Sequence, residues 1–354
     1  MKRIGILTGG GDCPGLNAVI RAAVRTLIRQ YHLEVVGIQL GFEGLLTKAI
    51  VPLTLESIRG ILPKGGTLLR TTNRGNPFEY PDGHGGCVDR SDEVVANIHE
   101  LGIDGIIAIG GDGTLKIAQR LCDVGIPMVA VPKTIDNDLE ATDYTFGFQT
   151  AVAVATDAVD RLHTTAESHD RVMILEVMGR NAGWIALYSG IAGGADIILI
   201  PEIPYKPRAI VDLIEERQGE GSKFDIIVVA EGAKRSGGEE TYLDKATRRL
   251  GGVAYQVAAD IQNHIDLEIR VTVLGHIQRG GSPIAFDRIL ASRYGAEAAN
   301  CIAREQFGQM VALRGDTITP VPIADAVSRP KYVNPESEIV SAARGLGVSF
   351  GDGR

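Results

Sequence analysis

The amino-acid sequence predicts an α/β protein with a doubly wound, mainly parallel sheet. Short β-branched runs alternate with amphipathic stretches of helical length, the runs are apolar without alternation, and several are followed by glycine clusters. Residues 4–7 are expected to form the first strand and residues 16–28 the first helix. Further strands are expected at residues 35–40, 105–109, 128–131, 172–177, 197–200, 226–230 and 271–274, and helices at residues 93–101, 115–124, 150–162 and 182–190.

Length, charge and cysteine content narrow the class of protein. The 354 residues suit two domains or one large one, and the net charge of −8 argues against nucleic acid as the main partner. No apolar run reaches the roughly 18 residues that a membrane helix needs, and the glycine-rich start does not suit a signal peptide. The four cysteines are scattered without CxxC spacing, which favours free thiols in a reducing cytoplasm.

The first glycine cluster, residues 9–11, lies between the first predicted strand and the first predicted helix. Ligands of doubly wound sheets bind beyond the carboxyl ends of the strands. Glycine lets backbone N–H groups approach a phosphate, and the N-terminus of a helix favours negative charge. The cluster therefore predicts an anion site, although a tight turn would use the same residues. Cys13 is interpreted as a small turn residue, since no histidine lies nearby in sequence to activate it.

The segment Gly-Gly-Asp-Gly-Thr at residues 110–114 is the stronger phosphate motif, because it holds Asp112 among three glycines at the end of a predicted strand. A carboxylate oxygen suits Mg²⁺, either directly or through water. The flanking glycines would leave room for phosphate groups. We expect a polyphosphate donor here, with a purely structural turn as the alternative.

The segment Pro-Lys-Thr-Ile-Asp-Asn-Asp at residues 132–138 follows another predicted strand. Transfer of a phosphoryl group to an alcohol needs alignment, charge neutralisation and a base for the hydroxyl proton. Asp136 and Asp138 would point the same way in an extended segment, so one could be the base while the other structures the loop. Lys133 and Thr134 would complete an anion site. An exposed acidic loop is the alternative.

Basic residues recur where a phosphate could meet them. Arg180 follows the strand predicted at residues 172–177, and His276 and Arg279 lie among glycines. Arg171 and Arg270 add two more cations, and the arginine fork can bind phosphate oxygens bidentately. The recurrence of these cations indicates a sugar-phosphate pocket.

The chain resembles the bacterial-type 6-phosphofructokinases over roughly residues 3–295, on the motifs GILTGGGDCPGLNAVIRAAVR, GGDGT, TIDND, TDYTFGF, SHDRV, EVMGR, VLGHIQRGGSP and DRILASR, in that order. The GGDGT element is also found in NAD kinases and in lipid kinases of the diacylglycerol kinase type, which lack the other motifs. The resemblance implies two similar Rossmann-like domains with the active site in the cleft between them. Residues 1–147 with about 278–328 would bind ATP, and about 148–277 with 329–354 would bind fructose 6-phosphate.

The resemblance also implies the reaction. The γ-phosphoryl of Mg-ATP would pass to the 1-hydroxyl of fructose 6-phosphate, giving fructose 1,6-bisphosphate and ADP in cytoplasmic glycolysis. An allosteric homotetramer, or a dimer, is implied, in which arginines reach the active site of a neighbouring subunit. Neither nucleic acid nor a membrane is an expected partner.

Site residues follow from the same resemblance, position by position. The donor positions are Gly11, Arg74, Gly111, Asp112, Gly113, Thr114 and Lys133, with Asp112 at the magnesium position. Asp136 matches the base, Thr134 and Asp138 match its neighbours, and Arg180 matches the cation that stabilises the transferring phosphoryl. Arg74 lies in residues 70–92, a Gly-, Pro- and Asn-rich segment expected to be a long loop, either a lid or an insertion.

The acceptor and effector positions complete the set. Contacts to fructose 6-phosphate are implied for Thr134, Asp136, Met178, Gly179, Arg180, Glu231, His276 and Arg279, and, across a subunit interface, for Arg171 and Arg270. Arg21 and Arg25 match two arginines of the family's effector site, while His163 stands where an arginine is common.

Lys133 and Gly113 favour different phosphoryl donors. Most bacterial ATP enzymes have glycine where this chain has Lys133, whereas pyrophosphate-dependent relatives typically have lysine there together with aspartate at the position of Gly113. A side chain at residue 113 would repel the α-phosphate of a nucleotide, so Gly113 favours ATP, with pyrophosphate as the alternative. A catalytically silent sugar-phosphate-binding subunit is a remoter alternative, disfavoured by Asp112, Asp136 and Arg180. A nicotinamide dehydrogenase is weaker still, since the glycine fingerprint is imperfect.

Overall fold

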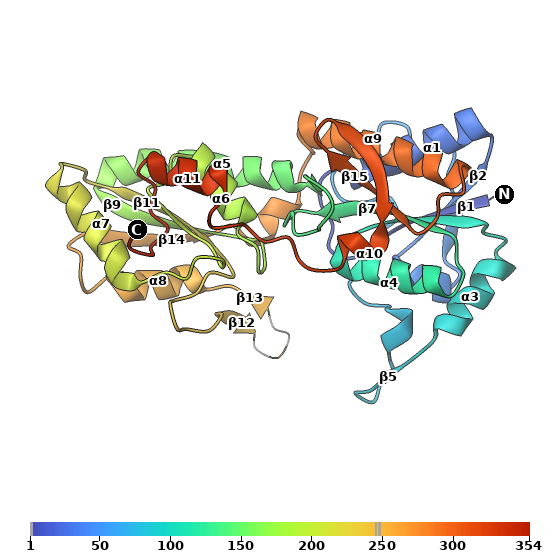
Figure 1. Ribbon diagram of the computed structural model, residues 1–354, viewed down its shortest axis with the longest axis horizontal. Coiled ribbons are helices and arrows are strands. Elements are labelled where there is room, and N and C mark those ends of the chain that lie inside the picture. Colours follow the sequence, from blue (N-terminus) through green and yellow to red (C-terminus); the bar gives the residue numbers. More distant parts are fainter. Residues whose placement is uncertain (1–2, 245, 247–248) are drawn as a thin grey trace. The chain divides into compact units, whose positions relative to one another are not determined.

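Figure 1 shows the computed structural model, which describes residues 3–244, 246 and 249–354. The chain divides into two units. Unit 1 comprises Met1–Gln149 and Arg279–Pro330, and unit 2 comprises Thr150–Gln278 and Lys331–Arg354. Each unit is built on a mainly or wholly parallel sheet with helices against it, so the expected fold class is confirmed.

Unit 1 contains an eight-stranded sheet among its described residues. In spatial order its strands are β16 (Thr317–Pro322), β15 (Gln309–Arg314), β7 (Met128–Thr134), β6 (Gly105–Gly110), β1 (Arg3–Thr8), β2 (Glu34–Ile38) and β3 (Ile50–Pro52), with β8 (Phe146–Gly147) paired to β7. Among the described strands of this sheet, the central pairs are parallel and the outer pairs, β2 with β3 and β15 with β16, are antiparallel. The carboxyl ends of β1, β6 and β7 therefore lie at one edge of the sheet.

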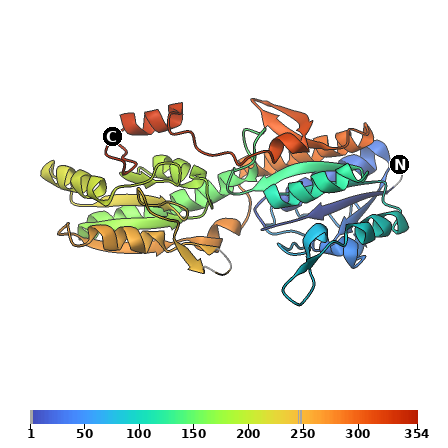
Figure 2. The same ribbon diagram turned by 60° about the horizontal axis from the view of Figure 1, so that its bottom comes forward.

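Helices cover both faces of this sheet (Figures 1 and 2). One face carries α1 (Leu16–Tyr31) and α9 (Ala285–Ala303), and the other carries α3 (Ser91–Glu100) and α4 (Asp112–Asp123). A Cβ at Gly295 of α9 would overlap the carbonyl oxygen of Val19, so glycine permits the close approach of α9 to α1. Shorter elements of unit 1 are α2 (Glu43–Leu46), α10 (Ile323–Ala326), the 3₁₀ helix η1 (Pro77–Glu79), and the strands β4 (Tyr80–Pro81) and β5 (Cys87–Val88).

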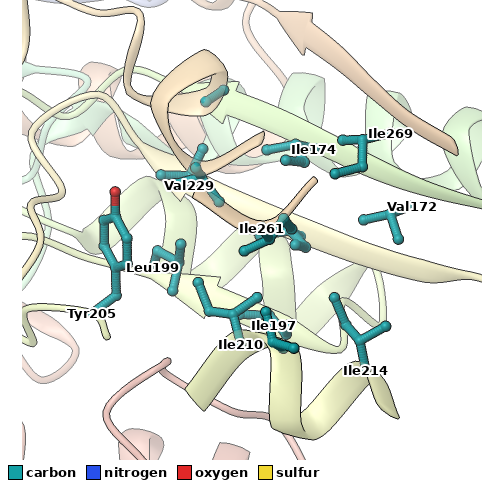
Figure 3. Packing of buried hydrophobic residues seen from close by; sticks show 14 of the residues in the cluster. Val172, Ile174, Ile197, Leu199, Tyr205, Ile210, Ile214, Val229, Ile261 and Ile269 are labelled. Atoms are coloured by element: carbon teal, nitrogen blue, oxygen red, sulfur yellow. The ribbon is translucent and has the colours of Figure 1, made fainter. Parts of the chain in front are cut away.

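Unit 2 is built on a four-stranded parallel sheet in the order β10 (Ile197–Leu199), β11 (Asp225–Ala230), β9 (Arg171–Val177) and β14 (Glu268–Val273). Its helices are α6 (Trp184–Ala192), α7 (Pro207–Gly219), α8 (Val253–Ile261), α11 (Glu338–Gly345) and most of α5 (Phe148–His169), which begins in unit 1. A strand pair, β12 (Tyr242–Asp244) with β13 (Arg249–Leu250), and the 3₁₀ helix η2 (Gly275–Arg279) complete the described elements. Figure 3 shows strand residues such as Ile174 and Val229 packed against Ile210 and Ile261 from α7 and α8.

The C-terminal segment closes the β10 edge of this sheet. Ser349 forms a parallel bridge with Ile197, and the amide of Ile198 donates to the Ser349 carbonyl at 2.9 Å. Phe350 is fully buried, and the Arg344 guanidinium pairs with Asp352 at 2.7 Å. An open strand edge would expose unpaired backbone groups, so the tail completes the fold of unit 2.

Several expected elements differ in extent. The helix expected at residues 115–124 is α4, which begins three residues earlier at Asp112, and the loop expected at residues 70–92 contains η1, β4, β5 and the start of α3. No element was predicted from the sequence at the positions of α9, β15 and β16. The apolar pattern of α9 is not one-sided, because Asp287 and Tyr294 are buried while Ile289 is exposed. In the described part of the chain, no helix combines the length and hydropathy needed to span a membrane.

Candidate active site

The first glycine loop joins β1 to α1 at the carboxyl edge of the unit 1 sheet. Gly10 has a φ of 77°, in the left-handed region that favours glycine, and the amide of Gly9 donates to the Ile109 carbonyl at 2.9 Å. A Cβ at Gly11 would lie 3.0 Å from the guanidinium of Arg279. No described side chain caps the start of α1, and its first turn has no acidic residue. The loop thus offers backbone N–H groups and a neighbouring cation to an anion.

The second glycine turn joins β6 to α4 and lies against the first. The buried Thr114 side chain bridges them, since a Cβ at Gly9 would lie 2.6 Å from its hydroxyl and a Cβ at Gly110 would overlap it. Asp112 is half-exposed in the first turn of α4 and pairs with Lys116 at 2.9 Å. Around Gly113, by contrast, no described atom other than those of its chain neighbours and of the α4 backbone lies within 4 Å of a Cβ position. Neither packing nor a positive φ therefore requires glycine at residue 113.

Lys133 brings a buried cation to the first loop. Its side chain lies at the carboxyl end of β7, is 3% exposed, and donates from Nζ to the carbonyl of Gly11. Burial lowers the pKa of this ammonium, although the neighbouring Asp136 opposes the shift. Cys13 lies nearby and is fully buried, which raises its pKa to about 12. This thiol therefore stays protonated, in agreement with its interpretation as a turn residue.

Asp136 is a buried carboxylate at the end of the same strand. It is 3% exposed, Oδ2 lies 4.0 Å from the Arg279 guanidinium, and Oδ1 makes no hydrogen bond to any described residue. A buried oxygen without a partner is costly, so such an atom often marks a place where a ligand supplies the missing partner. The group can accept a proton from a hydroxyl brought to Oδ1.

The backbone after β7 holds Asp136 in place. The amide of Asp136 donates to the Thr134 hydroxyl at 3.0 Å, and the Thr145 hydroxyl donates to the Thr134 carbonyl at 2.7 Å. Asn137 has a φ of 52° and accepts from the Thr145 amide at 3.0 Å. Because the backbone of Asn137 has a left-handed conformation, the segment is not extended. Asp136 and Asp138 are therefore not placed on the same side by strand geometry, as the sequence had suggested.

In unit 2, Met178, Gly179 and Arg180 form a tight turn after β9. Gly179 has a φ of 141°, and a Cβ there would lie 2.5 Å from the Ala182 carbonyl oxygen. The amide of Arg180 donates to Glu231 at 3.0 Å, so the backbone is fixed while the guanidinium is exposed. The turn therefore fixes the backbone of Arg180 and leaves its positively charged side chain exposed.

Glu176, in the same motif, has a structural role that the sequence did not reveal. Its buried carboxylate accepts from the amides of Gly252, at 3.0 and 3.1 Å, and Ala254, at 2.9 Å, at the start of α8. A carboxylate that satisfies the first N–H groups of a helix also complements the helix dipole. Glu176 therefore anchors α8 to β9.

The structure places the other basic residues that the sequence predicted for the site at several different positions. Arg171 and Arg270 both pair with Glu268 on the edge strand β14, and together they lower the pKa of that carboxyl although desolvation opposes the shift. His276 is exposed in η2, and Arg74 is exposed in unit 1. Arg21 and Arg25 line a different cavity of about 420 Å³, together with Arg29, Leu55, Glu56, Ile58, Arg59 and Gly60.

The structure thus brings together Gly11, Lys133, Asp136 and Arg279 in unit 1, and Arg180 with Glu231 in unit 2. Arg279 was expected among the sugar-phosphate contacts and lies beside the candidate base. Among the residues that the structure describes, no group of three or more His, Cys, Asp or Glu side chains is arranged to hold a metal ion.

The chain is similar to known proteins over most of its length. The profile of the family described as Phosphofructokinase matches residues 3–302. ATP-dependent 6-phosphofructokinase 2 of Clostridium perfringens is 52% identical over 99% of both chains. The pyrophosphate–fructose 6-phosphate 1-phosphotransferase of Streptomyces coelicolor is 50% identical over 99% of this chain and all of the relative. The crystal structure of Pichia pastoris phosphofructokinase in the T-state matches with a TM-score of 0.81 and 34% identity, over 92% of this chain and 37% of that longer one.

Proposed function

The chain belongs to the phosphofructokinase family, and we propose that it is an ATP-dependent 6-phosphofructokinase. It transfers the γ-phosphoryl of ATP to the 1-hydroxyl of fructose 6-phosphate, giving fructose 1,6-bisphosphate and ADP, as a step of glycolysis in the cytoplasm. The observation that carries this function is Asp136, a buried carboxylate whose Oδ1 has no hydrogen-bond partner among the described residues and whose Oδ2 lies 4.0 Å from Arg279.

Unit 1 supplies the donor side. The glycine turns bind the phosphates through Gly11, Gly111, Gly113 and Thr114, and Arg74 and Lys133 supply positive charge. Asp112 serves the magnesium ion, which proteins commonly hold through one or two carboxylates together with substrate phosphates and water. The half-exposed carboxylate of Asp112, in the first turn of α4, suits that use. Bound magnesium would neutralise phosphate charge during transfer.

Asp136 is the base that takes the proton of the sugar hydroxyl, with Thr134 and Asp138 as its neighbours. The transferring phosphoryl spreads negative charge over its oxygens, so the protein contributes mainly alignment and electrostatic stabilisation. Arg180 supplies that stabilisation. Met178, Gly179, Glu231, His276 and Arg279 contact fructose 6-phosphate.

Pyrophosphate is the competing donor, and it has specific support. The relatives from Clostridium perfringens and Streptomyces coelicolor have nearly equal identity and are named for different donors, so overall similarity does not decide between them. Lys133 favours pyrophosphate, and Gly113 favours ATP. Neither packing nor a positive φ requires glycine at residue 113, which is consistent with a role of this residue toward the donor.

A direct assay tests the function. Purified protein with Mg²⁺ and fructose 6-phosphate is offered ATP or pyrophosphate separately, and fructose 1,6-bisphosphate is measured. We expect turnover with ATP. Turnover with pyrophosphate alone would overturn the ATP proposal, and sugar-phosphate binding without turnover with either donor would favour the silent regulatory subunit.

The protein is proposed to be a homotetramer, or a dimer, in which Arg171 and Arg270 reach the 6-phosphate bound to a neighbouring subunit. Both lie on β14 or its neighbour β9, and β14 is an edge strand whose Arg270 is exposed. Light scattering coupled to gel filtration is expected to give a mass two or four times that of the chain. A particle of one chain would contradict this arrangement.

Arg21 and Arg25 are proposed to bind an anionic effector. Four arginines line the cavity of about 420 Å³, and Arg29 and Arg21 lower the pKa of Arg25 through their charge. Such a cluster favours an anion that relieves the repulsion. We expect inorganic phosphate, used as an anionic probe, to shift the fructose 6-phosphate saturation curve of the native enzyme and to have less effect on Arg25→Ala. An equal response in both proteins would argue against this site.

A further inference from the structure

Residues 63–74 form an irregular segment of unit 1 that ends at Arg74 and is here called the donor arm. All of these residues are described, and none belongs to a helix or strand. The buried side chain of Leu69 packs where a Cβ at Gly37 would overlap it. The conformation of the arm therefore depends on contacts with other parts of unit 1.

One side chain makes three of these contacts. Asn17, in the first turn of α1, is 4% exposed. Its Nδ2 donates to the carbonyls of Lys64 at 3.1 Å and Gly65 at 3.2 Å, and its Oδ1 accepts from the Leu68 amide at 2.8 Å. Both amide protons and the carbonyl oxygen of Asn17 are thus used on one segment.

The far end of the arm is joined to the first glycine loop. The amide of Gly10 donates to the Thr72 carbonyl at 3.1 Å, and the Thr71 hydroxyl donates to the Gly10 carbonyl at 2.6 Å. The Thr8 hydroxyl donates to the Arg70 carbonyl at 2.8 Å. Arg74 follows two residues after this junction, so its position relative to the glycine loop depends on how the arm is held.

The near end of the arm touches the segment after Arg279. The Ser282 hydroxyl donates to the Pro63 carbonyl at 2.6 Å, and a Cβ at Gly65 would overlap the carbonyl oxygen of Gly281. The arm is therefore packed between two segments that carry proposed site residues. Asn17 lies on the helix that begins at the glycine loop itself, which makes it the direct link between that loop and the arm.

We propose that Asn17 is a positioning residue for the phosphoryl donor, acting through the arm on Arg74. The inference rests on the proposed function, in which Arg74 contacts the donor. Removing the amide of the buried Asn17 leaves three backbone groups of the arm without their side-chain partner, and the arm must shift or bind water in its place. A misplaced arm moves Arg74 away from the donor phosphates, whereas the hydrogen bonds described for Asn17 reach none of the proposed sugar-phosphate residues.

The expected result is selective. Asn17→Ala should lower kcat/KM for ATP by roughly 10- to 100-fold, the cost of a small misplacement in a preorganised site, and leave the KM for fructose 6-phosphate within about twofold of the native value. Asn97→Ala is the matched control. Asn97 is 6% exposed and its Nδ2 also donates to two carbonyls, of Leu45 at 2.9 Å and Leu46 at 3.3 Å, neither of which belongs to the arm.

A double-mutant cycle separates positioning from general destabilisation. In an Arg74→Ala background, Asn17→Ala should add little further loss of kcat/KM for ATP. Hydrogen exchange should show faster exchange in residues 64–74 of Asn17→Ala and not in the same residues of Asn97→Ala. Equal losses in Asn17→Ala and Asn97→Ala, or an undiminished effect of Asn17→Ala in the Arg74→Ala background, would overturn the proposal. Absence of turnover in the native protein would overturn the proposed function instead, while hydrogen exchange would still report whether Asn17 holds the arm.

Discussion

Asp136→Asn is expected to lower kcat by about 10²- to 10⁴-fold, the contribution typical of a positioned general base. The amide keeps the shape of the carboxylate but cannot take the proton of the sugar hydroxyl. The KM for fructose 6-phosphate should change little, because the base acts mainly in the transition state. Steady-state kinetics with each substrate varied in turn would measure both quantities.

The stability of this variant should not fall. The native Asp136 buries a carboxylate oxygen without a hydrogen-bond partner among the described residues, and an amide lowers this cost; the loss of the 4.0 Å pairing with Arg279 offsets only part of that gain. A thermal unfolding midpoint at or above that of the native protein would therefore accompany the loss of activity. If the variant were both inactive and much less stable, the loss of activity would reflect unfolding and would not identify Asp136 as the base.

Asp138→Asn is the matched comparison, because the spacing of the two carboxylates in the sequence does not show which of them is the base. Asn137 turns the chain through a left-handed residue, so the carboxylates at residues 136 and 138 need not share an environment. We expect a smaller loss in Asp138→Asn. A near-native kcat for Asp136→Asn with a large loss for Asp138→Asn would assign the proton to Asp138.

The positions of the two glycine turns, each between a strand and a helix, could be predicted from the sequence because the signal is local. Gly10 has a left-handed φ, and Gly9 and Gly110 leave room for the Thr114 side chain, so glycine is needed at these turn positions. The structure begins α4 at Asp112, two residues after the end of β6. The helix was expected to begin later only because residues 112–114 were assigned to the turn, whereas they form its first turn.

Other features depend on contacts between distant parts of the chain. Asn17 bonds to groups 47 to 51 residues away, and Glu176 bonds to amides 76 and 78 residues away. No spacing rule in the sequence connects such distant positions. From their local motifs alone, Asn17 and Glu176 could equally well be interpreted as ligand-binding residues. That Asp136 Oδ1 has no hydrogen-bond partner among the described residues is likewise a property of packing, so the sequence could indicate the carboxylate but not its burial.

Gly113→Asp is expected to lower kcat/KM for ATP by about 10²- to 10³-fold while pyrophosphate activity persists or rises. Aspartate fits the site, because no described atom other than those of its chain neighbours and of the α4 backbone lies within 4 Å of a Cβ there, and the first turn of a helix favours acidic residues. Its carboxylate would face a nucleotide phosphate. Two unit charges about 4 Å apart repel by roughly 4 kcal/mol at an effective dielectric constant of about 20, close to a thousandfold in rate. Pyrophosphate lacks the α-phosphate and escapes this repulsion.

Gly113→Ala separates charge from bulk at the same position. Alanine adds a Cβ in open space and favours the helix by about 0.5–1 kcal/mol over glycine, so the protein should be at least as stable as the native form. If charge decides the donor, alanine loses much less ATP activity than aspartate. Equal losses in both variants would mean that steric exclusion decides it, and no loss in either would mean that residue 113 does not face the donor. Lys133 would then be the next position to vary, because it is the other residue at which the resemblance implies a difference between the donor classes, and its buried Nζ donates to the Gly11 carbonyl.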